Sequence, residues 1–298
     1  MATDKTCPGC GNIKPRFCGR KNEFEVFLCQ NCQTLFTLGE SAAAKFDYNG
    51  YYNEKNLSVP LFIEGRLKQI IDSFASYRRN NRLLDVGCGA GSLIMAAVQA
   101  DWQAEGVEVS KPAVDFLRQK DFQIFHGELA AARFPENSFD VVTASELLEH
   151  LPEPLGLLEE IRRILRPGGL FWATTPHGKG VSARLLGVDW TAVSPPEHLH
   201  LFSVKGIKIL LEKAGFNQVK IYTHGTNPFE IANALRGKLS PYKDLEINGE
   251  REFNRIETSY NLNEALSSSK PRQMVKNLLN RALNVTSLGD GLKIWAVK

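Results

Sequence analysis

The chain has 298 residues, 43% of them hydrophobic and 23% charged, with a formal net charge of +3. These values are typical of a globular protein with one substantial core and room for a small extra module. No apolar run approaches the ~20 residues that a membrane-spanning helix needs, and the first residues form no apolar signal segment. We therefore expect a cytoplasmic protein without a membrane span. The basic residues are scattered along the chain, which does not favour nucleic acid as a partner.

Two Cys-x-x-Cys pairs stand near the N-terminus, Cys7 with Cys10 and Cys29 with Cys32. Their separation is typical of a four-cysteine zinc site, in which each pair places two thiolates on one tetrahedral ion. Four protein ligands leave no open coordination position, so the zinc would be structural. The alternative is a set of reduced cysteines without metal. Cys18 lies between the pairs and is predicted to be a bystander.

The segments around the second pair alternate in hydrophobicity, which predicts strands at 23–28 and 34–38. A module of residues 1–45 is too small to be held by core burial alone, so a metal would stabilise it. The sequence thus resembles a zinc ribbon over residues 1–45. Residues 46–80 follow as a linker and a helix at 61–77, where apolar residues recur at helical spacing.

An apolar strand beginning at Leu83 leads into a turn with three glycines, Gly87, Gly89 and Gly91. Asp85 precedes the first glycine by two residues, which a purely structural turn does not require. Residues 92–100 fit a helix that is apolar on one face. The unit is therefore a strand, a glycine turn and a helix N-terminus, where backbone N–H groups point outward.

The stretch Asp85–Gly91 resembles motif I, D/E-x-G-x-G-x-G, of the class I S-adenosylmethionine (SAM) dependent methyltransferases. This resemblance implies SAM as the methyl donor. It also implies a doubly wound, mostly parallel seven-stranded α/β sheet of Rossmann-like type. In such enzymes an aromatic segment before the first helix often closes over the cofactor, which makes Tyr51 and Tyr52 candidates for that role. The alternative is a glycine turn without a ligand.

The second strand, at 104–109, contains Glu108, which lies 21 residues after Gly87. Doubly wound folds place a carboxylate on a ribose at about this distance. A carboxylate accepts hydrogen bonds from both vicinal hydroxyls of a ribose. Glu108 is therefore a candidate ribose ligand, and the alternative is a solvated glutamate at a strand end.

The third strand is predicted at 122–125, and the resemblance implies that Glu128 and Leu129 after it contact the adenine. The family usually carries Asp at the position of Glu128. A turn enters the fourth strand within 137–144, which is followed by Ser145, a further candidate cofactor residue.

The stretch 145–151 resembles the motif after strand four in the small-molecule branch of the family. Glu149 and His150 in it lie near the methyl donor or, alternatively, only cap the following helix. A helix at 159–165 is predicted to end at Arg166–Gly169, before a fifth strand at 170–175.

The stretch Pro195–Ser203 has two histidines, His198 and His200, on one face of an extended segment. It resembles the P-E-H-L-H-x-F-S sequence that precedes the last helix in this branch, which implies that one histidine faces the acceptor. The alternative is a core or capping role. Ser203 is predicted to cap a helix at 204–214.

Strands are predicted at 219–222 and 291–298, and the resemblance implies that they close the sheet as an antiparallel pair, with the last strand beside the fifth. The SAM-binding domain would then comprise residues 81–225 and 289–298. Residues 226–288 form an insert too long for a simple loop. They are predicted to be a helical acceptor lid or, alternatively, a surface for dimerisation.

Methyl transfer from a sulfonium is an in-line displacement with a good leaving group, so position and a dry pocket matter more than a nucleophile. If the acceptor is a hydroxyl, an imidazole suits the general base. The candidates are His150, His198, His200 and His177. The predicted function is methyl transfer, at oxygen, to a small-molecule or glycan acceptor. The alternatives are an RNA methyltransferase whose zinc module contacts RNA, and a non-enzymatic scaffold; the sequence leaves the oligomeric state open.

Overall fold

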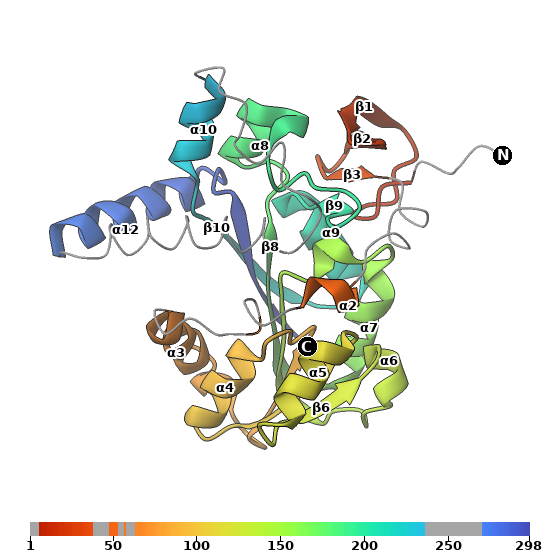
Figure 1. The fold of residues 1–298 in the computed structure, drawn as a ribbon, viewed down its shortest axis with the longest axis vertical. Coiled ribbons are helices and arrows are strands. Elements are labelled where there is room, and N and C mark those ends of the chain that lie inside the picture. The colour runs from red at the N-terminus through yellow and green to blue at the C-terminus, as the bar shows by residue number, and fades with distance from the viewer. Residues whose placement is uncertain (1–5, 38–47, 53–56, 58–62, 236–269) are drawn as a thin grey trace. The chain divides into compact units, whose positions relative to one another are not determined.

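The computed structural model describes residues 6–37, 48–52, 57, 63–235 and 270–298 (Figure 1). The chain divides into two compact units. Unit 1 comprises Met1–Phe46, Thr175–Ile207 and Ile221–Lys293, and unit 2 comprises Asp47–Thr174, Lys208–Lys220 and Ile294–Lys298. These unit ranges differ from the predicted boundaries of the ribbon, the SAM-binding domain and the insert, which stay a prediction.

A seven-stranded sheet has the order β10-β11-β8-β7-β4-β5-β6. Its strands are β4 (Arg82–Val86), β5 (Gln103–Glu108), β6 (Gln123–His126), β7 (Phe139–Ser145), β8 (Leu165–Pro176), β10 (Gln218–His224) and β11 (Gly291–Val297). The pairings β4 with β5, β4 with β7, β5 with β6 and β7 with β8 are parallel. The last strand lies between β8 and β10, so the predicted doubly wound sheet and the position of its last strand are confirmed.

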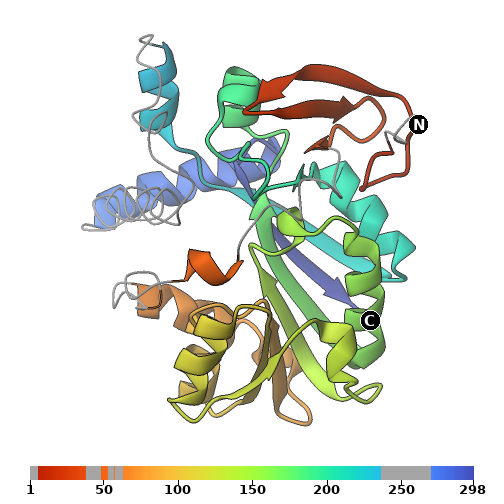
Figure 2. The ribbon, with the colours of Figure 1, turned by 45° about the vertical axis from the view of Figure 1, so that its right-hand side comes forward.

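Helices alternate with these strands, as Figures 1 and 2 show, because each parallel connection must cross back over the sheet. The helices of unit 2 are α2 (Tyr48–Tyr51), α3 (Glu64–Asp72), η2 (Ala75–Tyr77), α4 (Ser92–Gln99), α5 (Lys111–Arg118), α6 (Leu129–Ala132), η3 (Leu148–His150) and α7 (Pro154–Ile164). The helix α9 (Val204–Lys213) begins in unit 1 and ends in unit 2.

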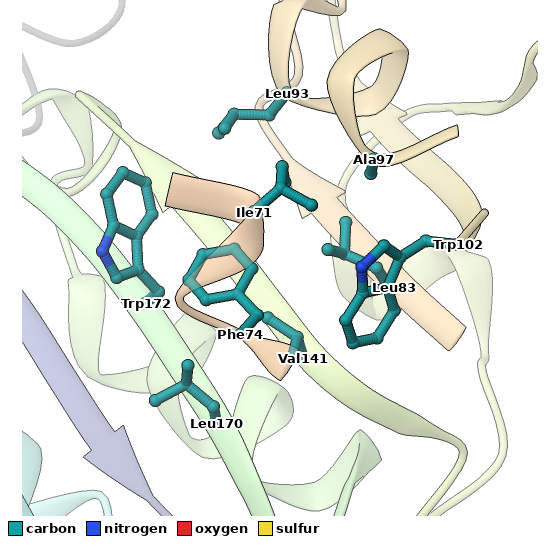
Figure 3. Close-up of a cluster of buried hydrophobic side chains, with 9 residues drawn as sticks. All are labelled: Ile71, Phe74, Leu83, Leu93, Ala97, Trp102, Val141, Leu170 and Trp172. Carbon is teal, nitrogen blue, oxygen red and sulfur yellow. The ribbon is translucent and has the colours of Figure 1, made fainter. Parts of the chain in front are cut away.

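One core of unit 2 joins α3 and α4 to the strands β4, β7 and β8 (Figure 3). Phe74 and Trp172 meet edge to face with ring centroids 5.8 Å apart. Leu83 and Val141 are fully buried in the same cluster. The apolar residues at helical spacing before β4 therefore pack on the sheet, as their periodicity predicts.

The prediction for the segment Arg166–Gly169 is wrong. It was expected to separate a helix from the fifth strand, but α7 ends at Ile164 and β8 begins at Leu165. The N–H of Gly168 donates to the carbonyl of Lys298 at 2.9 Å, and the N–H of Lys298 donates to Gly169 at 3.1 Å. The glycine pair thus pairs with the end of the chain instead of forming a loop.

The ribbon module is part of a four-stranded sheet in unit 1 with the order β1-β2-β3-β9. Its strands are β1 (Pro15–Lys21), β2 (Phe24–Cys29), β3 (Leu35–Thr37) and β9 (His200–Leu201). β2 and β3 were predicted, whereas β1 was not. β9 comes from the histidine stretch and pairs antiparallel with β3, with Leu35 opposite Leu201 and Phe36 opposite His200.

Unit 1 also holds α8 (Val181–Leu186), η4 (Gly187–Asp189), α10 (Pro228–Leu235) and α12 (Lys270–Val285). The last two helices confirm that the predicted insert is helical at both ends, while residues 236–269 lie outside the described residues. Among the helices in the described ranges, none is long and apolar enough to cross a membrane.

Candidate functional site

The glycine turn after β4 has a backbone that requires glycine. Gly87, Gly89 and Gly91 have φ angles of +67°, +51° and +77°, in the left-handed region that other residues rarely adopt. A Cβ atom on Gly89 would lie 2.5 Å from the hydroxyl of Tyr52, and one on Gly91 would lie 2.4 Å from a methyl carbon of Leu117. The turn therefore has no room for side chains on its inner surface.

The predicted cofactor residues come together at one edge of the sheet. β4, β5, β6 and β7 run parallel, so their carboxyl ends lie along the same edge. Asp85 and Glu108 stand at the ends of β4 and β5, and Ser145 ends β7. Glu128 and Leu129 follow β6 and begin α6. Open α/β sheets bind ligands at this edge.

The carboxylate of Glu108 is already held by the backbone. Its two oxygens accept hydrogen bonds from the N–H groups of Gly89, Val109 and Ser110, each at 2.9 Å. A carboxylate accepts about four hydrogen bonds, so one further donor can be accommodated. A single ribose hydroxyl fits this capacity, whereas binding both hydroxyls would displace a backbone donor.

Asp85 lies beneath the turn and is 3% exposed. Burial raises its pKa to about 7, opposed by the hydrogen bond that the Thr143 hydroxyl donates at 2.6 Å and assisted by the negative charge of Glu108. The side chain thus joins β4 to β7 below the turn. Sequence reasoning missed Thr143, which only its place on the neighbouring strand reveals.

The other predicted cofactor residues differ in exposure. Leu129 is 3% exposed, while the side chain of Glu128 is exposed to solvent. The hydroxyl of Ser145 lies 2.8 Å from that of Thr174 on β8. Tyr51 and Tyr52 meet edge to face at 5.0 Å. Because the Tyr52 hydroxyl approaches Gly89, this tyrosine of the aromatic segment lies beside the turn.

The four cysteines of the ribbon form one group. The sulfur atoms of Cys7 and Cys32 lie 3.5 Å apart, as do those of Cys10 and Cys29, and all four lie within 4.8 Å of one another. Hydrogen bonding to Cys32 and burial raise the pKa of Cys7, while the same bond lowers the pKa of Cys32 to about 5. Four converging thiols fit tetrahedral zinc, and Cys18 is not part of the group.

The ribbon is fastened to the start of α9 within unit 1. The hydroxyl of Ser203 donates to the carbonyl of Cys32 and accepts the N–H of Gly206 at 2.9 Å. The sulfur of Cys32 lies 3.3 Å from the Thr34 hydroxyl. A Cβ atom on Gly206 would lie 2.2 Å from that same hydroxyl. The predicted cap by Ser203 is therefore present, and the same hydroxyl also contacts the second cysteine pair through Cys32.

Three of the candidate histidines are buried in unit 1. The Nδ1 of His198 is 2.8 Å from the carbonyl of Ala192, and His200, 3% exposed, lies in β9. The Nδ1–H of His177 donates to the carbonyl of Gly289 at 2.7 Å. His150 ends η3 in unit 2 and is half-buried. Their catalytic roles stay a prediction.

Residues 61–221, more than half of the chain, match the family described as "Methyltransferase domain". The chain belongs to this methyltransferase family. With the glycine turn and the doubly wound sheet, this match confirms the predictions of an enzyme and of a class I SAM-dependent methyltransferase.

Curated relatives of this methyltransferase carry a common name. The ubiquinone biosynthesis O-methyltransferase of Idiomarina loihiensis is 29% identical over 182 residues, which are 56% of this chain and 72% of that protein. The protein of the same name from Xanthomonas campestris pv. campestris is 32% identical over 129 residues, 40% of this chain and 54% of that protein. The shared region therefore spans about half of the chain.

A solved structure shares the fold. The crystal structure of a SAM-dependent methyltransferase from Archaeoglobus fulgidus has a TM-score of 0.53 to this chain at 19% identity, and the match covers 85% of this chain and all of that one. The similarity in structure thus extends well beyond the glycine turn.

Proposed function

We propose that the protein transfers the methyl group of SAM to an oxygen atom of a small-molecule acceptor. The observation that carries the proposal is the turn of Gly87, Gly89 and Gly91, whose glycine positions have no room for side chains. The N–H of Gly89 donates to Glu108 at the edge where open sheets bind ligands. The relatives named O-methyltransferases support oxygen as the receiving atom. A saccharide is included among the proposed acceptors.

The residues of unit 2 would position the cofactor. SAM supplies a methyl group on a sulfonium, which is a good leaving group. Glu108 would accept a hydrogen bond from the ribose, and the buried Leu129 would contact the adenine, with Glu128 as a partner for its polar edge. Ser145 and Tyr52 would border the bound molecule. Their shared task is to hold the donor in line with the acceptor oxygen and to exclude water.

An acceptor hydroxyl loses its proton during the transfer, and a base within hydrogen-bond reach would accept it. We propose His150, His198 and His200 as the candidates for this base. His177 suits the role poorly, because burial lowers its pKa to about 4 and its Nδ1–H is bound to Gly289. Its neutral imidazole therefore stabilises the fold through the hydrogen bond to Gly289.

We propose that Cys7, Cys10, Cys29 and Cys32 hold a structural zinc ion, which four converging thiols support. Thiols must stay reduced to bind zinc, as they do in the cytoplasm, so we also propose a cytoplasmic location. We further propose that the insert of residues 226–288 takes part in acceptor selection.

The cofactor assignment is tested by calorimetric titration of SAM into the wild type and into Gly89→Arg. The variant places a side chain on a residue with φ of +51° beside Tyr52, so we expect its SAM affinity to fall at least about a hundredfold, which is roughly twice the 1.4 kcal/mol of one factor of ten. Gly156→Arg is the matched control, because Gly156 lies on α7 with open space around its Cβ position. Equal binding by both variants, or no binding by the wild type, would contradict the assignment.

The acceptor is tested separately, by incubating the protein with methyl-labelled SAM and fractionated metabolites. We expect label in a small molecule carrying a new methyl ether. Label found only in RNA would overturn the small-molecule proposal while leaving the SAM assignment intact.

A further inference from the structure

One side of helix α12 contacts the rest of unit 1. The Oδ1 of Asn284 accepts the N–H of Thr223 at 2.9 Å, and the Oδ1 of Asn280 accepts the N–H of Gly225 at 3.1 Å. Leu283 on the same side is buried at 8% exposure. Figure 1 shows the C-terminal end of this helix beside β10.

The opposite side of α12 is apolar and exposed. Its large exposed side chains are Met274 (66%), Val275 (62%), Leu278 (64%), Leu279 (49%) and Val285 (79%). At about 100° per residue these positions fall within one arc of about 140°, and that arc lies opposite the attached side. The other exposed large apolar residues of the described ranges each lie on a different segment, so α12 alone gathers them into a stripe.

The charge of α12 is of one sign. Residues 270–289 contain four basic residues, Lys270, Arg272, Lys276 and Arg281, and no acidic residue. By the same helical geometry Arg281 lies at one border of the apolar arc. Apolar side chains bordered by cations are typical of helices that lie in the interface of an anionic membrane.

We propose that α12 is a docking surface for an anionic lipid surface, in which its apolar arc enters the boundary between headgroups and acyl chains. The stripe is aliphatic and holds no aromatic side chain, whereas the centres of protein interfaces are enriched in aromatic residues. A second copy paired through the same face would bring cations of two helices together, which is unfavourable. Lipid phosphates instead complement Arg281 and the positive net charge of residues 270–289.

The experiment measures co-sedimentation of the full-length, zinc-loaded protein with two kinds of vesicle. One kind is phosphatidylcholine alone, and the other also contains phosphatidylglycerol. We expect binding to the anionic vesicles, at least about tenfold weaker binding to the neutral ones, and release by salt at an ionic strength that screens surface charge. The double variant Leu278→Asp with Leu279→Asp should bind anionic vesicles at least about tenfold less than the wild type.

Leu185→Asp is the matched control, because Leu185 is 57% exposed on α8 of the same unit. It should bind the vesicles as the wild type does, and all three proteins should bind SAM and zinc alike, which shows that they are folded. Equal binding to both vesicle types, an unchanged double variant, or an equal loss in the control would overturn the proposal. Self-association of the wild type that the double variant loses, without vesicle binding, would assign the stripe to a second copy instead.

Discussion

His177 shows how burial sets the role of a single histidine. Its side chain is 1% exposed, and burial lowers its pKa from 6.5 to about 4, against the opposing effect of the hydrogen bond to Gly289. The folded state therefore favours the neutral imidazole. Its contribution to stability is complete above the unfolded-state pKa of 6.5 and is lost as the pH falls towards 4.

Replacement of this residue by His177→Asn should flatten that pH dependence, because an amide can donate to the same carbonyl without titrating. Between pH 7 and pH 4 we expect the wild type to lose about 3 kcal/mol more of its free energy of unfolding than the variant loses. Urea denaturation at both pH values measures the difference. Replacing the exposed His126 by Asn is the control, and a His177→Asn protein with the wild-type pH dependence would refute the explanation.

Asp140 is a second residue whose importance the sequence does not reveal. Its carboxylate is fully buried, accepts the N–H groups of Arg79 at 2.7 Å and Asn81 at 2.8 Å, and pairs with the guanidinium of Arg166. We expect Asp140→Ala to lower the free energy of unfolding by about 3–5 kcal/mol, since Arg166 loses its partner and two backbone donors lose their acceptor. Chemical denaturation checks this value. Replacing Asp72, which pairs with Lys68 at an exposed position, should change stability by less than about 1 kcal/mol.

At the scale of elements, the ribbon and the histidine stretch form one structure. β9 extends the ribbon sheet by pairing with β3. The N–H of Thr37 donates to the carbonyl of Leu199 at 2.9 Å, and the hydroxyl of Ser203 donates to the carbonyl of Cys32. A metal at the four cysteines would therefore hold the strand that carries His200.

Removal of the proposed zinc ion should accordingly loosen β9. In Cys32→Ser we expect the zinc content to fall from about one ion per chain to none, and the amides of residues 199–201 to exchange faster by at least about tenfold. Elemental analysis and hydrogen exchange measure the two effects. Cys18→Ser is the control and should retain zinc and slow exchange. A zinc-free Cys32→Ser protein with protected amides in β9 would show that the metal does not support this strand.

The sequence predicts local elements well and distant pairings poorly. The strand, turn and helix around Gly87 follow from neighbouring residues, because hydrophobic period and glycine spacing act over short distances. β1 was missed because Arg16, Arg20 and Lys21 interrupt any alternating pattern. The pairing of Phe36 with His200 joins residues far apart in the chain, which no local period encodes.

In the candidate site, too, the sequence reveals some features and not others. Asp85 and Glu108 could be found from their spacing to the glycines, and the structure brings them to one sheet edge. The three backbone donors to Glu108 could not be found, since they depend on how the loops after β4 and β5 meet. The helical character of the insert could be predicted, but the exposure of one face of α12 requires coordinates.

At the scale of the whole molecule, several helices and strands run from one unit into the other. β8, α9, β10 and β11 each contain residues assigned to both units. Neither unit can complete these elements without the other part of the same strand or helix.

We therefore expect the zinc-loaded protein to unfold in one cooperative transition, for which the calorimetric and van't Hoff enthalpies agree. Scanning calorimetry measures both. Adding SAM at about 100 times its dissociation constant should stabilise the entire transition by about 2.7 kcal/mol. Two separated transitions, with only one shifted by SAM, would show that the units unfold independently.

The placement of the tryptophans makes the two units optically distinguishable. Of the four in the chain, Trp102, Trp172 and Trp295 belong to unit 2, and only Trp190 belongs to unit 1. Trp190 is 5% exposed and packs in a cluster with Val26, Leu35 and Leu201 from the ribbon and β9. A protein in which phenylalanine replaces the other three would emit from this indole alone. Its emission wavelength would then report directly on the ribbon during treatment with a chelator, which would remove the proposed zinc ion.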